Sequence, residues 1–382
     1  MLVRLTNTPR DYAWGSTTLL AGLEGRAPTG TPEAEVWFGD HPGAPATVAD
    51  GTGLPLDRWL AAHNRPPLPY LLKLLAAAHP LSIQAHPSKA QAQAGFAREV
   101  AAGVPRDAAH RNYRDDNHKP ELIVAVSDAF GALAGLREIA ATRRLFAQLP
   151  NTAGVRAVRE RLQTMDATPA AVLARLVPWL LSPAASDVVA DVLKAVAGTR
   201  FGTEFPAELA FARRLLDEVP GDPGIVVALF MNLVVLRRGE GLFLPAGVLH
   251  AYFDGLGVEV MAASDNVLRG GLTEKHVDVA ELGAVLDATP GPVEVLRPVP
   301  GDDGVAGYPV PVPDFALRCV RVSDRPVALT PRGAAIALVT AGEVELSDGA
   351  EAVLLRPGQA ALTDAPLQVR GTGELFLAEP GG

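Results

Sequence analysis

The sequence is poor in cysteine and in long apolar runs, and each shortage excludes a class of protein. Cys319 is the single cysteine among 382 residues, which excludes an internal disulfide, and no nearby pattern suggests a cysteine metal site. No stretch offers about 18 uninterrupted apolar residues, and residues 1–16 lack a basic stretch followed by an apolar run. We therefore expect a cytoplasmic protein with no membrane partner.

Excess charge of one sign is also modest. The formal net charge is -9 and the acidic residues are scattered rather than grouped in blocks. Neither nucleic acid nor an anionic membrane is therefore an expected partner, and an anionic substrate would need a local basic pocket. We expect a monomer, with a dimer as the alternative.

Lysine is the scarce cation of this chain. Of the 34 basic residues five are lysines, at positions 73, 89, 119, 194 and 275. Ammonium and guanidinium groups differ in shape, hydration and tunability of the pKa, so a retained lysine indicates a site where arginine would not serve. Chance is the alternative explanation.

The length of the chain predicts two or three domains, and the pattern of apolar residues changes along it. Residues 1–136 carry short apolar runs between glycines and prolines, which predict strands joined by loops. Residues 137–222 repeat apolar residues every three or four positions, as amphipathic helices do. Residues 223–289 return to a strand-like pattern, and residues 290–382 are dominated by short predicted strands.

Two stretches of the sequence look alike. Residues 237–247 and 355–362 each place a turn with glycine before an apolar strand. This similarity predicts two related jelly-roll β-barrels in one chain. The expected fold is therefore mainly β, with a first barrel from residues 1–136 and 223–289, a helical insertion at 137–222, and a C-terminal barrel at 290–382.

Four side chains from separate stretches could meet at one metal ion. Gln84 and His86 are two residues apart, so on a strand they project from the same face. Glu121 stands at the entrance of an apolar strand, and His250 follows a tight turn. Two imidazoles, one carboxylate and one amide oxygen suit Zn²⁺ and leave positions open for water or substrate. Taken singly, a histidine at a strand end is more often structural than a ligand.

The segment from Val258 to Lys275 is dense in polar groups directly after an apolar strand. Its residues 264–266 would also suit a capped loop. Two features favour function instead. Arg269 precedes two glycines that permit close backbone approach, and Lys275 is one of the scarce lysines.

Together these motifs resemble the type I mannose-6-phosphate isomerases, a zinc-dependent branch of the cupin superfamily. The matching stretches keep the family's order: Tyr12 to Ser16, Glu35 to Pro42, Leu81 to Lys89, Tyr113 to Glu121, and Leu249 to Lys275. The resemblance implies two cupin-like barrels, of which the first is catalytic. It implies an aldose-ketose isomerase of carbohydrate metabolism that interconverts mannose 6-phosphate and fructose 6-phosphate and supplies GDP-mannose biosynthesis.

The resemblance also implies roles for individual residues. The positions that match the zinc ligands are Gln84, His86, Glu121 and His250, and Arg269 matches the catalytic arginine. The residues implied to line the sugar phosphate pocket are Trp14, Lys73, Ser82, Lys119, Tyr252, Glu259, Asp265 and Lys275. Glu274 departs from the family, whose members often have proline there. We expect His41 and His118 to brace loops rather than to bind the ion.

Isomerisation of this kind moves a proton between C2 and C1 through a cis-enediol or enediolate. A metal can polarise the two oxygens, and Arg269 can stabilise the negative charge that develops. The proton carrier stays open among Glu259, Lys119, His86 and a metal-bound water. The phosphate is expected to meet Lys73, Ser82, Lys275 or Arg269.

Each pocket residue also has a structural interpretation. Glu259 could simply pair with a neighbouring cation, Tyr252 and Trp14 could pack in the wall, and Asp265 could cap a loop. At the level of function, two histidines and a carboxylate also describe an iron-dependent cupin oxygenase, which would not need the cationic residues. The sequence is also compatible with a sugar-binding regulator without catalysis and with an isomerase of relaxed aldose selectivity.

Overall fold

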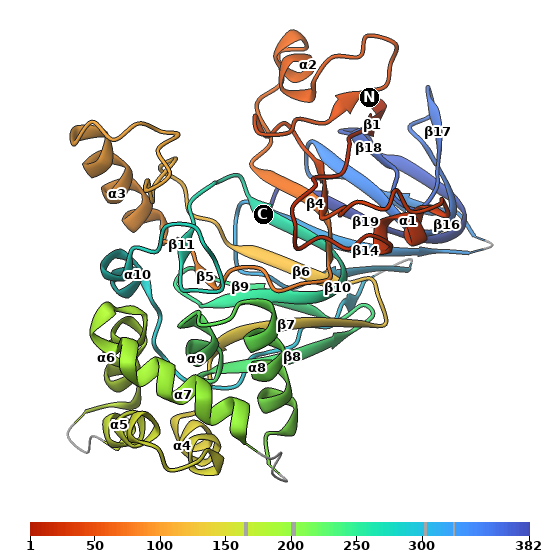
Figure 1. Ribbon diagram of the computed structural model, residues 1–382. Coiled ribbons are helices and arrows are strands. Elements are labelled where there is room, and N and C mark those ends of the chain that lie inside the picture. Colours follow the sequence, from red (N-terminus) through yellow and green to blue (C-terminus); the bar gives the residue numbers. More distant parts are fainter. Residues whose placement is uncertain (164–166, 200–203, 302–303, 324) are drawn as a thin grey trace.

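The computed structural model of the chain describes residues 1–163, 167–199, 204–301, 304–323 and 325–382. Two β-sheets and a block of helices make up the molecule (Figure 1). The helices of residues 139–228, yellow to green in the figure, gather at one end, and the strands of the last part of the chain, blue, lie at the other end. The expectation of a mainly β fold with helices is confirmed.

The sheet nearer the helices is arranged around one long strand, β10. Its path runs β11-β5-β10-β4-β2, while β6 and β7 also pair with β10, β9 pairs with β6, and β8 pairs with β7. The strands of this sheet are β2 (Glu35–Phe38), β4 (Tyr70–Ala77), β5 (Gln84–Ala85), β6 (Glu121–Ala125), β7 (Ala129–Leu136), β8 (Met231–Arg237), β9 (Gly241–Leu244), β10 (His250–Ala262) and β11 (Leu268–Arg269).

The register of β10 brings distant polar residues together. His250 lies opposite Gln84 of β5, and Glu259 lies opposite Lys73 of β4. Met261 lies opposite Glu121 of β6. Strands β4 and β6 are buried along their whole length, so these polar residues stand in otherwise apolar surroundings.

The other sheet combines the C-terminal strands with two from the start of the chain. Its path runs β12-β13-β14-β19-β16-β18-β1-β3, with β15 on β19 and β17 on β16. Its strands are β1 (Leu2–Thr6), β3 (Thr47–Val48), β12 (Val299–Pro300), β13 (Val305–Tyr308), β14 (Ala316–Val322), β15 (Val327–Leu329), β16 (Ala335–Ser347), β17 (Ala352–Leu355), β18 (Ala360–Thr363) and β19 (Leu367–Glu379).

The pairing of β1 differs from the expected grouping of all strands in residues 1–136. Leu2 lies opposite Thr363, and Leu5 lies opposite both Ala360 of β18 and Val48 of β3. The apolar residues of β1 are buried against the C-terminal strands. Strand pairing over such a distance depends on tertiary packing, which local sequence pattern does not reveal.

The expected helical block at residues 137–222 is present with slightly different limits. Threonine side chains begin two of its helices: Thr152 accepts a hydrogen bond from Val155 N, and Thr168 accepts one from Ala171 N. The helices of the block are α4 (Ile139–Gln148), α5 (Ala153–Leu162), α6 (Pro169–Leu181), η1 (Pro183–Ala185), α7 (Ser186–Gly198), α8 (Pro206–Glu218) and α9 (Gly224–Ala228). Outside it lie α1 (Leu19–Glu24), α2 (Leu56–Ala62), α3 (Lys89–Ala101) and α10 (Val279–Val285).

Apolar clusters hold these parts together. One joins the helical block to the sheet around β10, with Leu173, Phe146 and Phe230 among its buried members. Another lies between the two sheets and includes Leu72 of β4 and Phe376 of β19. Burial of these side chains fixes the sheets and the helical block relative to one another.

The two stretches that look alike in sequence also have similar backbones. Gly239 precedes β9 with φ 81°, and Gly358 precedes β18 with φ 83°. Both glycines lie in the left-handed region that favours glycine over other residues. Each sheet therefore contains a strand that follows the same kind of glycine turn.

Among the described residues, no single helix combines the length and the apolar character needed to span a membrane. The stretches Pro169–Leu181 and Pro183–Gly198 meet these criteria only as a pair that bends by 88°.

Candidate active site

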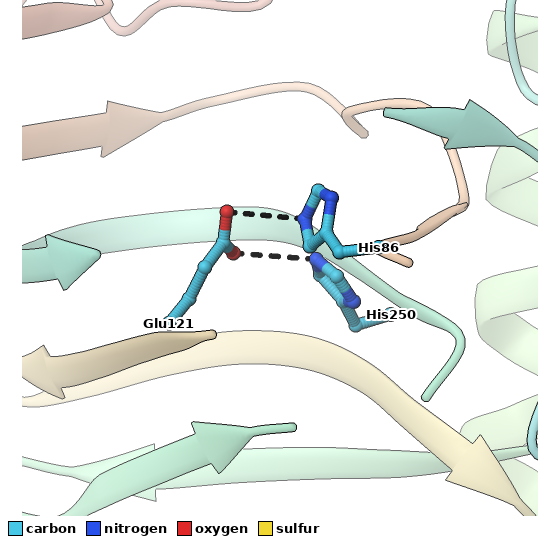
Figure 2. A group of neighbouring side chains, drawn as sticks. All are labelled: His86, Glu121 and His250. Carbon is cyan, nitrogen blue, oxygen red and sulfur yellow. Dashed lines mark ion pairs between the residues drawn. The ribbon is translucent and has the colours of Figure 1, made fainter. Parts of the chain in front are cut away.

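Two histidines and a glutamate meet in the interior of the sheet around β10. His86 Nε2 lies 3.1 Å from Glu121 Oε1, and His250 Nε2 lies 3.3 Å from Glu121 Oε2. Figure 2 shows both imidazoles turned toward the carboxylate of Glu121. Each of the three residues is 1% exposed, and their ligand atoms all lie within 4.8 Å of one another. This cluster could hold a metal ion.

The other ring nitrogen of each histidine is tied to the backbone. His86 Nδ1 lies 2.7 Å from the carbonyl oxygen of Asn266, and His250 Nδ1 lies 3.0 Å from that of Val248. A carbonyl oxygen only accepts hydrogen bonds, so each Nδ1 must carry the proton and each Nε2 keeps a lone pair. Metal-binding histidines are commonly oriented in this way.

Gln84 completes the predicted set of four ligands. Its side-chain Nε2 lies 3.3 Å from His250 Nε2. The two orientations of an amide differ by an exchange of nitrogen and oxygen, and the reversed orientation would direct Oε1 toward the cluster. The structure therefore brings together the four residues that the sequence suggested.

Burial and the neighbouring charges favour a neutral His86 and an ionised Glu121. Burial lowers the pKa of His86 to about 4, and the Lys119 ammonium acts in the same direction. Burial alone would raise the pKa of Glu121, but the charge of Lys119 and the contacts with the two imidazoles hold it well below the usual range. Neutral imidazole and carboxylate are the forms that bind metals.

A polar cavity of about 290 Å³ opens beside the cluster. Its wall contains most of the residues predicted for the substrate pocket. Those residues are Trp14, Lys73, Ser82, Lys119, Tyr252, Glu259, Arg269 and Lys275, and the predicted ligands Gln84 and Glu121 stand in the same wall. His86 and His250 lie just behind the wall, through their contacts with Glu121. The cavity is also lined by residues for which no role was predicted, including Tyr12, Glu35, Leu272 and Thr273.

Lys73 stands between two carboxylates in this wall. Its Nζ lies 3.0 Å from Glu259 Oε2 and 3.5 Å from Glu35 Oε1, and it lies 5.1 Å from the centre of the Trp37 ring. Burial alone would lower the pKa of Lys73, but the charges of Glu259 and Glu35 raise it. Lys73 is therefore a cation at neutral pH. Burial raises the pKa of Glu259, against the charge of Lys73.

Tyr252 and Lys119 lie close to the same carboxylates. Lys119 Nζ is 2.8 Å from Glu121 Oε1. Burial raises the pKa of Tyr252 well above its usual value, and the charges of Glu259 and Glu121 add to this effect. The Tyr252 hydroxyl therefore stays protonated and is a potential hydrogen-bond donor within the cavity.

Arg269 and Lys275 give the cavity a cationic side. Within the described ranges, neither side chain has a carboxylate at ion-pair distance. Burial lowers the pKa of both groups, and the neighbouring positive charge of Arg114 lowers each further. Cations that repel one another and lack a carboxylate partner form a favourable site for an anion.

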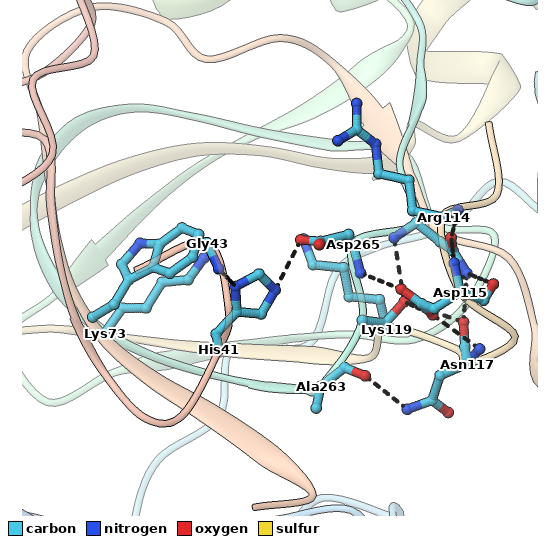
Figure 3. Close-up of polar contacts among 12 residues, drawn as sticks. His41, Gly43, Lys73, Arg114, Asp115, Asn117, Lys119, Ala263 and Asp265 are labelled. Atoms are coloured by element: carbon cyan, nitrogen blue, oxygen red, sulfur yellow. Dashed lines mark hydrogen bonds and ion pairs between the residues drawn. The ribbon is translucent and has the colours of Figure 1, made fainter. Parts of the chain in front are cut away.

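Asp265 is the one predicted pocket residue that does not line this cavity. It lines a neighbouring cavity of about 440 Å³ together with His41 and Arg114. Asp265 Oδ1 lies 3.1 Å from His41 Nε2, and Gly43 N donates to His41 Nδ1, so that His41 carries its proton on Nε2. Figure 3 shows His41 and Asp265 pointing toward one another. The expected bracing role of His41 is confirmed by these contacts.

Asn266 is a structural residue of the site that the sequence did not reveal. Its side-chain nitrogen donates to the carbonyl oxygens of Asp115 and Asn117, and its side-chain oxygen accepts from Arg114 N. The Asp115 carboxylate in turn accepts hydrogen bonds from Ser264 Oγ and from Asp265 N (Figure 3). Two loops are thus joined next to the carbonyl that orients His86. Three polar residues in a row were the only signal in the sequence.

His118 also braces a loop, as expected. Its Nε2 lies 2.8 Å from Asp314 Oδ2, which belongs to the C-terminal part of the chain. The contact ties the segment that carries Lys119 and Glu121 to the other sheet. His118 does not contribute to the His86–Glu121–His250 cluster.

Comparison with known proteins agrees with this geometry. The family described as phosphomannose isomerase type I, catalytic domain, matches residues 2–139. Mannose-6-phosphate isomerase of Escherichia coli (strain K12) is 36% identical over 391 residues, covering 97% of this chain and 98% of the relative. The chain belongs to the mannose-6-phosphate isomerase family. The human member is 30% identical over 412 residues, covering 96% of this chain and 91% of the relative.

Solved structures of the family match the whole chain. A zinc-bound holo form of mannose 6-phosphate isomerase superposes with a TM-score of 0.88 at 34% sequence identity, and 100% of each chain is covered. The same values hold for the enzyme from Salmonella typhimurium bound to substrate and zinc. The resemblance predicted from the sequence is confirmed.

Proposed function

We propose that this chain is a zinc-dependent mannose-6-phosphate isomerase that interconverts mannose 6-phosphate and fructose 6-phosphate. The observation that carries the proposal is the pair of imidazoles with free Nε2 lone pairs around Glu121, next to a cavity with a cationic side. Full-length relatives of the same family support it.

One zinc ion would be held by Gln84, His86, Glu121 and His250. The donor set fits the ion because two neutral nitrogens and one carboxylate face one point, and because His86 Nε2 and Glu121 Oε2 are buried without a hydrogen-bond partner among the described residues. Bound there, zinc would supply positive charge that polarises the oxygens at C1 and C2 of the sugar.

The chain's own residues bind the phosphate and stabilise the charge that develops on the sugar. Arg269 is proposed to stabilise the enediolate, since its guanidinium stays cationic at every working pH. Lys275 and Ser82 are proposed to bind the phosphate from the same wall of the cavity. Trp14 and Tyr252 would orient the sugar ring, while Asp265 would act from the neighbouring cavity.

Proton transfer between C2 and C1 is proposed to use Glu259, with Lys119 beside it. The raised pKa of buried Glu259 makes its carboxylate a stronger base than an exposed one. Lys73 would hold that carboxylate in place at 3.0 Å. His86 is a poor candidate for the base because its Nδ1 is bonded to the carbonyl oxygen of Asn266 and its Nε2 would be a ligand of the zinc ion.

The finer description of the fold belongs to the same proposal. We propose two cupin-like jelly-roll barrels, the first from residues 1–136 and 223–289 and the second from residues 290–382, with residues 137–222 as a helical domain inserted into the first. The similar glycine turns before β9 and β18 support a common origin of the barrels. A monomer acting in the cytoplasm remains the prediction from the sequence.

The decisive experiment is the turnover of mannose 6-phosphate by purified protein before chelation, after chelation and after zinc is added back. We expect activity to disappear with the metal and to return with zinc. Arg269→Ala should lower kcat/KM by about 10²-fold or more. Arg321→Ala is the matched control, because this arginine is 77% exposed on the other sheet and should leave turnover unchanged.

The absence of turnover in folded, zinc-loaded protein would refute the proposal. Oxygen consumption with ferrous iron would then point to a cupin oxygenase. Sugar phosphate binding without turnover would instead point to a sugar-binding regulator.

A further inference from the structure

A carboxylate of the helical block reaches the loop that follows Arg269. Asp222 lies between α8 and α9, and its side chain accepts three backbone hydrogen bonds. Its Oδ1 accepts from Gly224 N at 2.7 Å and from Leu272 N at 2.9 Å, and its Oδ2 accepts from Thr273 N at 3.1 Å. Asp222 therefore joins the start of α9 to the loop between Arg269 and Lys275.

The loop held in this way has an unusual backbone. Leu272 has φ 55°, in the left-handed region that residues with a side chain rarely adopt. Such a conformation persists only where the surrounding structure holds it. The two bonds from Leu272 N and Thr273 N to Asp222 lie directly at this residue.

The contact also requires two glycines. A Cβ atom on Gly271 would lie 2.5 Å from Gly224 Cα, and a Cβ atom on Gly224 would lie 2.6 Å from Leu272 N. Only backbones without side chains can approach so closely. The helical block and the loop are thus fitted together at the position where Asp222 acts.

The same loop is bonded on its other side to the segment that carries Ser82 and Gln84. Gly270 N donates to Ile83 O at 2.7 Å, and Ile83 N donates to Gly271 O at 3.0 Å. Leu272 and Thr273 then line the cavity. The loop between Arg269 and Lys275 is therefore fixed between Ile83 and Asp222.

Asp222 directs its carboxylate to backbone amides and not to the nearby cations. No ion pair joins it to Arg269 or Lys275 among the described residues. The two cations thus keep their charge available for an anion while the loop that carries them is held still. Preorganisation of this kind strengthens binding because the loop need not be ordered when the ligand arrives.

We propose that Asp222 is a positioning residue for phosphate recognition. It holds the loop at residues 270–273 so that Lys275 approaches the phosphate, and Arg269 the sugar, of the substrate from fixed directions. The inference rests on the proposed isomerase function and gives the helical insertion a part in substrate binding.

The test compares Asp222→Asn with the wild type and with Asp191→Asn. Asparagine keeps the size of the side chain, but its NH₂ group would face the N–H of Thr273, which is also a donor. Asp191 is the matched control: it accepts a hydrogen bond from Gly154 N within the helical block and does not line the cavity. The quantities measured are KM and kcat for mannose 6-phosphate and the inhibition constant of inorganic phosphate.

For Asp222→Asn we expect the KM and the inhibition constant of phosphate to rise about tenfold, because bonds to a charged acceptor are strong. Asp191→Asn should leave both constants at the wild-type value even if its melting temperature falls. Asp222→Glu keeps the acceptor oxygens and should give a smaller rise, which provides a second variant if Asp222→Asn does not fold.

Unchanged phosphate inhibition and KM in both Asp222 variants, measured on folded protein, would overturn the inference. Equal rises in Asp191→Asn and Asp222→Asn would also overturn it, because the effect would then reflect general loss of stability. Failure of the wild type to turn over mannose 6-phosphate would count against the proposed function instead.

Discussion

Glu259 and Lys73 face each other across the neighbouring strands β10 and β4, and their charged ends lie 3.0 Å apart in the protein interior. They are 2% and 6% exposed. A buried ion pair contributes little net stability, but the loss of one partner leaves a buried charge that is costly. The contribution of the pair to stability and its contribution to turnover can therefore be measured separately.

The first prediction concerns this pair. Lys73→Met should lower the free energy of unfolding by about 3–5 kcal/mol, because it leaves Glu259 and Glu35 buried without their cation. Glu259→Gln should lower it less, because Lys73 keeps Glu35 as a partner. The double variant should recover part of the loss caused by Lys73→Met but not the turnover. Urea unfolding and steady-state kinetics measure the two effects. Recovery of activity in the double variant would mean that the pair is only structural.

The second prediction concerns Asn266, which is fully buried and bonded to two loops. Asn266→Ala should lower the free energy of unfolding by about 3 kcal/mol, because it leaves buried backbone groups unpaired. It should also weaken zinc binding, because the Asn266 side chain holds in place the loop whose backbone carbonyl orients His86.

Chelator competition checks the weaker zinc binding. Asn232→Ala is the control, because Asn232 also donates to two backbone carbonyls but bonds neither to the loops that Asn266 joins nor to a side chain of the cluster. Zinc affinity lost equally in both variants would contradict the orienting role of Asn266.

The third prediction concerns pH. Burial lowers the pKa of His86 from 6.5 to about 4. Between these values the unfolded chain binds a proton that the folded, metal-free chain does not, so acidification favours unfolding. The free energy of unfolding of the chelated protein should fall by about 3 kcal/mol from pH 6.5 to pH 4 through this residue.

Urea titrations of the chelated protein at a series of pH values measure the slope of the free energy of unfolding against pH. His86→Gln should flatten it, whereas replacement of the exposed His110 by Gln should not. An equal slope in the wild type and in His86→Gln would show that other groups dominate the pH dependence.

The fourth prediction concerns the single cysteine. Burial raises the pKa of Cys319 to about 12. The thiolate is the reactive form, so at pH 8 only about one molecule in 10⁴ would carry it. Iodoacetamide should therefore leave folded protein unmodified and fully active, and should modify it once in urea. Mass spectrometry measures the modification, and rapid labelling of the folded protein would show that Cys319 is accessible.

The helical segment and the proposed metal ligands could be predicted because their signals are local. Apolar residues at helical spacing mark the segment from α4 to α8, and Gln84 and His86 stand two residues apart at β5. The end of the block differs from the prediction. The segment from residue 223, expected to be strand-like, begins with α9 before β8.

Other parts could not be predicted because they depend on contacts between distant segments. In the sequence Asp222 has the appearance of a turn residue, since two of its three partners are backbone amides about fifty positions away. Asp265 belongs to a sequence motif typical of the substrate pocket, but its side chain lines the neighbouring cavity, next to His41. Backbone partners have no signature in residue type, so only the fold reveals them.

The pairing of β1 with β18 has a consequence for synthesis. A ribosome makes β1 first, whereas its partner strand emerges only after nearly the whole chain has been translated. Until then β1 offers unpaired backbone groups, and long-range pairing of this kind is slow to form. Chains interrupted before residue 360 would keep that exposed strand permanently, so premature termination should yield aggregating fragments rather than a working catalytic half.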